Sequence, residues 1–147
     1  MMKKTGKITR VKLQIDQIDD FILLGLVSTE PDYKLSLALN RKFRISLKSI
    51  SPIRLYGELE TELLFSRFSD SVESPDRIFN LVSNRSGKNF LIRKLRNVDF
   101  IFQLHDSDNE LSIEQITSSL REIAGITAVF NIGLDSIKDK NLHYVIQ

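Results

Sequence analysis

The chain has 147 residues, of which 41% are hydrophobic and 27% are charged, and its formal net charge is +2. This length predicts one domain, residues 1–147, with a core of its own. The absence of cysteine excludes disulfides, thiolate metal sites and a cysteine nucleophile. No apolar run approaches the ~20 residues that cross a bilayer. The basic start, residues 1–7, lacks the apolar stretch of a secretion signal, so we expect a cytoplasmic protein without membrane contact.

The first third of the chain predicts two strands and a helix. Residues 8–15 alternate between apolar and polar side chains, which is the period of a half-buried strand. Residues 21–27 are almost continuously apolar, which favours a buried strand but also fits a short helix. Pro31 suits a first helical turn, and the spacing predicts a helix over 32–44 that buries Leu35, Ala38 and Leu39 and exposes Lys34, Arg41 and Lys42. Ser49 to Pro52 is expected to end this unit.

The middle of the chain is typical of a strand meander. Turn-forming residues occur at Gly57, at 74–76 and at 84–87. Between them the apolar patterns predict strands over 53–59, 61–69, 77–83, 89–93 and 98–104.

The last third predicts a second helix. Ser112 to Gln115 fits a capping box, and Gly125 suits a left-handed turn after the helix. The helix would bury one face, formed by Ile113, Ile116, Leu120 and Ile123. A return strand is expected over 126–132, followed by a short turn or helix and a strand at 144–146.

The order of these elements predicts the fold class. Helices are few and do not alternate with every strand, which favours α+β over α/β. We expect a mainly antiparallel sheet of about five to seven strands with two helices packed on one face.

Residues 92–100, Ile-Arg-Lys-Leu-Arg-Asn-Val-Asp-Phe, resemble the signature of the IPExxxVDY family, a group of uncharacterised bacterial proteins of about this length. Val98 and Asp99 match, Phe100 replaces a tyrosine, and Arg93 and Lys94 stand in place of Pro-Glu. Residues 20–26, 32–35 and 39–40 are similar to the N-terminal half of such proteins. The resemblance implies this length, this order of elements and a cytoplasmic location, and it implies no catalytic residue.

Two polar motifs have both a functional and a structural interpretation. His105, Asp106 and Asp108 have metal-binding or acid–base side chains, but they also fit a polar loop before the second helix. The Gly87-Lys88 pair resembles the end of a phosphate-binding loop, but no helix follows, so we expect a hairpin turn with Gly87 at positive φ.

The acidic residues favour structural roles. Glu58, Glu60 and Glu62 alternate, as on one solvated strand face that could also bind a cation or a basic partner. Asp99 is expected to bond a backbone donor or Arg96, because burying it without a partner would be costly.

Basic residues are concentrated in three blocks, at 1–12, 41–54 and 85–96. Each block holds five basic residues and no acidic one, and such segregation creates a basic surface on a nearly neutral protein. The third block lies beside Phe90 and Phe100, an arrangement that single-strand binders use, although both rings also fit the core pattern. The candidate interaction surface is Arg85, Lys88, Arg93, Lys94 and Arg96.

The sequence favours a non-enzymatic interaction module. It contains no convergent set of nucleophile, base and oxyanion donors, so we assign no catalytic residue, cofactor or metal. An exposed sheet edge in the meander makes a homodimer plausible beside an unknown protein partner. The alternative is a nucleic-acid-binding protein that uses the basic patch around residues 85–96.

Overall fold

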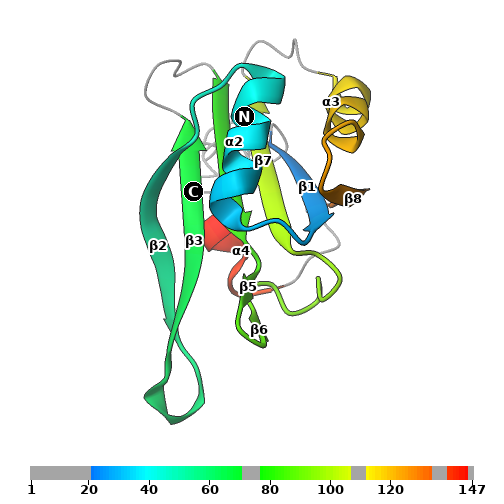
Figure 1. Cartoon of the computed structure of the whole chain (residues 1–147). Helices are drawn as coiled ribbons and strands as arrows, with labels where there is room; N and C mark the ends of the chain where they lie inside the picture. Colours follow the sequence, from blue (N-terminus) through cyan, green and yellow to red (C-terminus); the bar gives the residue numbers. More distant parts are fainter. Residues whose placement is uncertain (1–20, 71–76, 107–111, 134–138, 146–147) are drawn as a thin grey trace, which may run out of the picture.

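The computed structural model describes residues 21–70, 77–106, 112–133 and 139–145. These residues have the predicted α+β fold, with a six-stranded antiparallel sheet of order β2–β3–β4–β7–β1–β8 (Figure 1). A two-stranded hairpin, β5–β6, projects beside it. The elements are β1 (Phe21–Ser28), α2 (Asp32–Phe43), β2 (Lys48–Tyr56), η1 (Glu58–Glu60), β3 (Glu62–Asp70), β4 (Arg77–Ser83), β5 (Arg85–Ser86), β6 (Asn89–Phe90), β7 (Phe100–Asp106), α3 (Ile113–Arg121), β8 (Ile126–Asn131) and α4 (Leu142–Val145).

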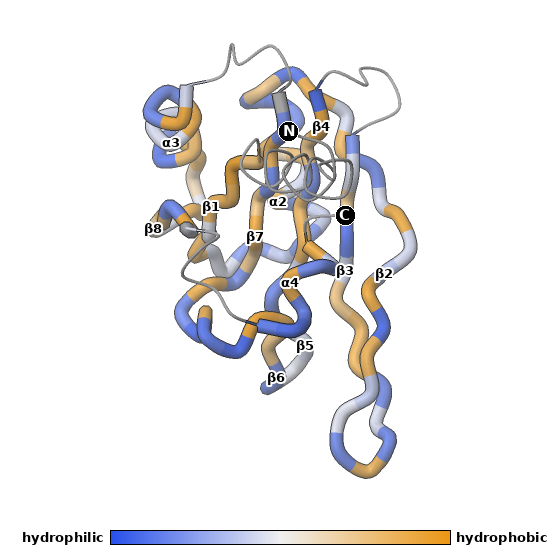
Figure 2. Tube along the Cα trace, turned by 180° about the vertical axis from the view of Figure 1, so that it is seen from behind, coloured by the Kyte–Doolittle hydropathy of each residue, from blue (hydrophilic) through white to orange (hydrophobic). Residues whose placement is uncertain are grey.

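The two longer helices pack on one face of the sheet, as predicted. Leu35 and Leu39 of α2 and Leu120 of α3 are buried in one cluster with apolar residues of β1, β4 and β7. Figure 2 shows the hydrophobic colour along β1 and β7, which are neighbouring inner strands of the sheet. Burial of these side chains supplies most of the driving force for folding.

A second apolar cluster covers the opposite face of the sheet. Alternate residues of the same strands, such as Leu23 and Ile101, point to this side. They meet Leu91 and Ile92, which lie in the segment before β7, and Val145 of α4. This cluster holds the segment that carries the third basic block against the sheet.

Residues 21–27 form a strand and not a helix. Strand β1 pairs with β7 and with β8, so that Gly25 lies opposite Ile101 on one side and Phe130 on the other. A Cβ atom at Gly25 would lie 2.8 Å from a methyl group of Val98, so glycine allows the chain before β7 to approach the sheet. The strand expected over 8–15 lies outside the described residues.

Two boundaries in the meander were predicted wrongly. Strand β2 begins at Lys48 and continues through Pro52, where we expected a break. Because β2 is an edge strand with a register shift between Ile50 and Ile53, the missing N–H of proline is tolerated there. The same strand ends at Tyr56, and Gly57 starts the hairpin turn.

Two further predicted strands are absent from the described residues. Only Asn89 and Phe90 of the segment 89–93 are extended, and they pair with β5. The C-terminal segment forms α4, and Ile146 lies outside the described residues. Asp139 starts this helical turn, because its carboxylate accepts from the Asn141 N–H at 2.8 Å and its carbonyl from the Leu142 N–H.

The N-terminal cap, the buried face and the glycine turn predicted for α3 are present in the structure. The Ser112 hydroxyl accepts a hydrogen bond from the Gln115 N–H, as in the expected cap. Ile116, Leu120 and Ile123 are buried, and Ile113 packs against the same cluster. The chain then turns at Gly125, with φ of 97°, into β8.

We expect Gly125→Ala to lower the free energy of unfolding by about 2 kcal/mol. Its φ disfavours an L-residue, and the new Cβ would lie 2.7 Å from Cγ of Glu30. Gly87→Ala is the control, because Gly87 also has positive φ but has no atom within 4 Å of such a Cβ. Urea denaturation of both variants separates the two effects, and an equal loss at both positions would contradict the steric part.

Candidate interaction surface

Asn84 organises the segment between β4 and β7, which contains the third basic block. Its side chain is completely buried, and Nδ2 donates to the carbonyls of Leu95 and Val98 at 2.8 and 3.0 Å. Oδ1 accepts from the Ile92 N–H at 2.8 Å. One amide side chain thus satisfies three backbone groups that have no strand partner, and it fixes the fold of residues 91–98.

Asp99 joins this segment to the sheet and orients Arg85. Its Oδ2 accepts from the Ser28 N–H at 2.9 Å, and its Oδ1 pairs with Nε of Arg85. The Arg85 guanidinium also lies 4.8 Å from the centre of the Phe90 ring. The expectation of a backbone donor for Asp99 is confirmed, but the arginine is Arg85 and not Arg96.

A groove lies between the β2–β3 hairpin and this segment. It has a volume of about 790 Å³. We call it the basic groove. It is lined by Leu55, Tyr56, Gly57, Glu58, Thr61 and Leu63 of the hairpin, by Lys88, Asn89, Phe90, Arg93 and Arg96 of the segment, and by Lys140 and Asn141.

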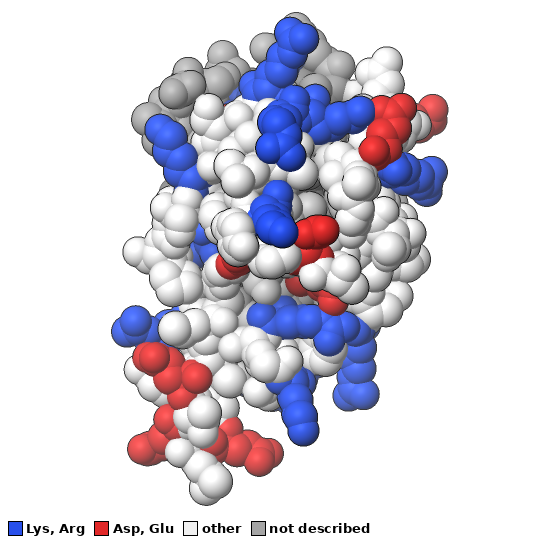
Figure 3. Space-filling model, viewed as in Figure 1, with Lys and Arg blue, Asp and Glu red and all other residues white. Residues whose placement is uncertain are grey.

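The charges in the basic groove are unbalanced. Four cationic side chains and one carboxylate, that of Glu58, line it. In the described part of the chain, none of the four cations forms an ion pair. Figure 3 shows the separation on one face of the molecule, with Lys and Arg near β5–β6 and acidic side chains at the end of the β2–β3 hairpin. Unpaired ammonium and guanidinium groups around a groove favour an anionic ligand.

The structure brings together part of the candidate surface. Lys88, Arg93 and Arg96 line the basic groove, whereas Arg85 is held by Asp99 and Lys94 is exposed outside the groove lining. Phe100 is buried in the core, and Phe90 is half-buried beside the groove.

Sequence reasoning missed the contributions of Tyr56 and Lys140. Lys140 lies just before α4 and is followed by Asn141, whose side chain donates to the Leu91 carbonyl at 2.8 Å. This bond places Lys140 beside a segment that lies far from it in sequence. No local pattern at either position could have indicated the groove.

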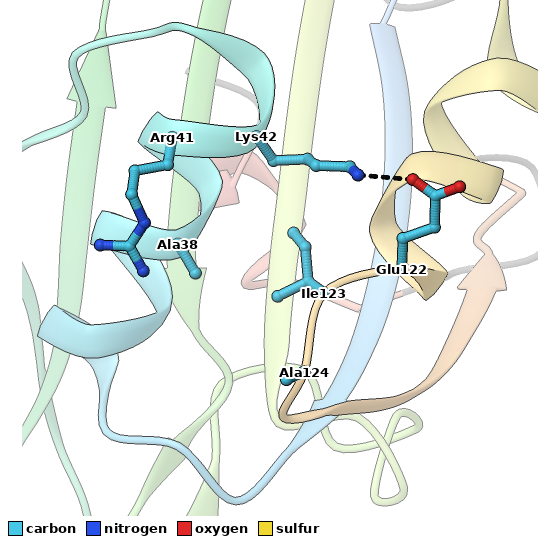
Figure 4. Close-up of a pocket in the computed structure, with 6 residues that line it drawn as sticks. All are labelled: Ala38, Arg41, Lys42, Glu122, Ile123 and Ala124. Carbon is cyan, nitrogen blue, oxygen red and sulfur yellow. Dashed lines mark hydrogen bonds and ion pairs between the residues drawn. The ribbon is translucent and has the colours of Figure 1, made fainter.

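Arg41 and Lys42 of the second basic block lie away from the basic groove. Arg41 and Lys42 line a smaller, shallow trough of about 320 Å³ between α2 and the chain that leaves α3, with Ala38, Ile123 and Ala124 (Figure 4). Lys42 reaches across it to the carboxylate of Glu122. The trough shares no residue with the basic groove, and the first basic block, 1–12, lies outside the described residues.

The acidic residues do not lie where we expected. Glu58 and Glu60 belong to the hairpin turn and not to a strand face, and Glu62, the first residue of β3, pairs with Arg54 at 3.0 Å. His105 and Asp106 end β7 and are not in a loop, and the His105 ring lies 4.9 Å from that of Phe21. Asp108 lies outside the described residues. Among the residues with described positions, no three His, Cys, Asp or Glu side chains are grouped as a metal ion requires.

These features define an α+β fold with a basic groove. The projecting β2–β3 hairpin forms one wall of the groove, and residues within 88–96, with Lys140 and Asn141, form the other. No described helix is long and apolar enough to span a membrane. The sequence matches no protein-family model, and no curated protein matches it either. The resemblance to the IPExxxVDY family therefore stays a prediction that rests on residues 92–100 and the N-terminal positions.

Proposed function

We propose that the chain is a cytoplasmic, non-enzymatic interaction module whose basic groove binds an acidic segment of a protein partner. One observation carries the proposal: four cationic side chains without ion pairs in the described part of the chain line one groove. The groove walls also contain apolar side chains, Leu55, Leu63 and Phe90. A peptide that combines carboxylates with an apolar side chain is complementary to both features.

Nucleic-acid binding is the second candidate. The positions of the aromatic residues support it less well than they support a protein partner. Single-strand binders stack bases on open aromatic faces beside a basic track. Here Arg85 packs over the ring of Phe90, so Tyr56, which is 68% exposed, offers the free ring in the groove lining. Glu58 also places a carboxylate in the groove, but it would repel phosphate and carboxylate ligands alike and does not separate the two candidates. The shortage of open aromatic faces in the groove lining is what favours the protein partner.

We expect the double variant Arg93→Glu/Arg96→Glu to lose the partner in a pull-down from lysate of the native cells. Reversing two of the four groove charges replaces attraction by repulsion, which lowers affinity more than about tenfold. The control is Lys34→Glu/Arg121→Glu, which changes net charge equally at exposed helix positions outside the groove. A partner held by the wild type and by this control, but not by the groove variant, supports the proposal.

Nuclease treatment separates the two candidates. A protein partner retained after nuclease supports the interaction module, whereas recovery that disappears with nuclease would favour nucleic acid. In that case, the affinity for a single-stranded oligonucleotide would fall steeply with salt, because phosphate contacts release counterions. Equal recovery by the groove variant and the wild type would contradict both uses of the groove.

A further inference from the structure

The end of the β2–β3 hairpin presents an apolar residue that the rest of the described chain does not cover. Leu59 is 97% exposed at the hairpin end, which extends away from the sheet (Figure 1). Figure 2 shows a short hydrophobic segment there between hydrophilic ones. The turn is closed by two backbone hydrogen bonds, from Gly57 N–H to the Thr61 carbonyl at 2.7 Å and from Thr61 N–H to the Glu58 carbonyl at 3.2 Å. Leu59 is therefore held outward by a defined turn.

The same turn is acidic. Glu58 and Glu60 flank Leu59, and neither forms an ion pair in the described part of the chain. Leu59 and Glu60 both have positive φ, 57° and 58°, which is uncommon for residues other than glycine. The hairpin tip, residues 58–60, thus combines one exposed leucine with two unpaired carboxylates.

The hairpin tip is complementary to the basic groove in both charge and polarity. The groove supplies four cations and the apolar side chains of Leu55 and Leu63. Tip and groove also share the β2–β3 hairpin, because Glu58 of the tip lines the groove together with Leu55, Tyr56, Gly57, Thr61 and Leu63. A two-fold axis that relates two copies with antiparallel hairpins would bring the tip of each copy toward the groove of the other in two identical contacts.

We propose that the groove binds a second copy of this chain, through reciprocal docking of residues 58–60 of each copy into the basic groove of the other. The inference rests on the proposed function, since it names the acidic partner of the same groove. It places the dimer contact at the hairpin tip and not along the sheet edge, where Pro52 and the register shift interrupt β2.

A charge-swap experiment on the full chain tests this arrangement. The tip variant is Glu58→Lys/Glu60→Lys, and the groove variant is Arg93→Glu/Arg96→Glu. We expect wild type to dimerise in sedimentation equilibrium, and each variant alone to dimerise at least about tenfold more weakly, because like charges then face each other. An equimolar mixture of the two variants should restore a one-to-one heterodimer, since both reciprocal contacts regain opposite charges.

Two further measurements accompany the charge swap. Thermal melts verify that the variants fold, which is expected because all the substituted residues lie on the surface. Leu59→Ser, which leaves every charge in place, should also weaken the dimer.

A monomeric wild type at all concentrations, or a mixture that stays monomeric, would overturn the inference. If the wild type is monomeric and the groove variant still loses another acidic protein in the pull-down, the proposed function stands without the dimer. If reversing the groove charges changes neither dimerisation nor the capture of any protein in the pull-down, both the dimer and the proposed function are contradicted.

Discussion

Asn84→Ala is expected to lower the free energy of unfolding by about 3–5 kcal/mol, which corresponds to a fall in melting temperature of roughly 10 °C. The completely buried Asn84 side chain satisfies the Ile92 N–H and the carbonyls of Leu95 and Val98. Its removal leaves the Ile92 N–H and the Val98 carbonyl without partners, and it leaves the Leu95 carbonyl with the Val98 N–H as its remaining donor. Thermal and urea denaturation followed by circular dichroism measure the loss.

Two controls separate hydrogen bonding from packing. Asn84→Asp keeps the volume and the acceptor for Ile92 but replaces the donor with an oxygen that faces two carbonyls, so it should cost at least as much as alanine. Asn89→Ala removes an exposed asparagine from the adjacent hairpin and should change stability by less than about 0.5 kcal/mol. If Asn84→Asp were as stable as wild type, the donor bonds would not be the stabilising contacts.

Phe102→Ala is expected to lower the free energy of unfolding by about 3–5 kcal/mol. Phe102 is fully buried on the central strand β7, and its ring packs 5.9 Å from that of Phe43 and 6.1 Å from that of Phe79, measured between ring centroids. Truncation leaves a cavity between the sheet and α2 that these neighbours cannot fill without leaving their own rotamers.

Phe130→Ala is the matched control for Phe102→Ala. Phe130 lies on the edge strand β8 and is 41% exposed, so the same truncation should cost less than about 1 kcal/mol. Urea denaturation of both variants, with unchanged m-values, supplies the comparison. Equal losses would indicate that Phe102 does not pack as the ring distances imply.

Local periodicity predicted the parts of the fold that depend on neighbouring residues. The spacing of Leu35 and Leu39 predicted helix α2. The order of strands and helices predicted that both helices pack on the same face of the sheet. Periodicity failed where distant residues decide the structure. Leu91 and Ile92 are apolar enough to continue a strand, but Asn84 accepts from both of their N–H groups, and they fold as a buried loop. Tyr144 and Val145 suit a strand, but Asp139 starts a helical turn before them.

The candidate site was predictable only in part, for a similar reason. Charge density alone identified Lys88, Arg93 and Arg96. The same criterion could not distinguish Arg85, because its pairing depends on the position of Asp99. Lys140 reaches the groove through the bond between Asn141 and Leu91, which joins segments about 50 residues apart. Glu58 and Glu60 alternate as in a strand, and only the position of the turn places them at the hairpin tip.

The position of β1 in the sheet has a consequence for folding during synthesis. Strand β1 is made early, yet both of its neighbours, β7 and β8, come much later in the chain. At ribosomal rates of about 5–20 residues per second, the 71 residues between Ser28 and Phe100 take roughly 4–14 s to make. Throughout that interval the apolar sequence Phe-Ile-Leu-Leu-Gly-Leu-Val lacks both of the strands that flank it in the described sheet. A nascent chain is therefore most prone to aggregation before β7 emerges, and chaperones that shield apolar segments would act in that period.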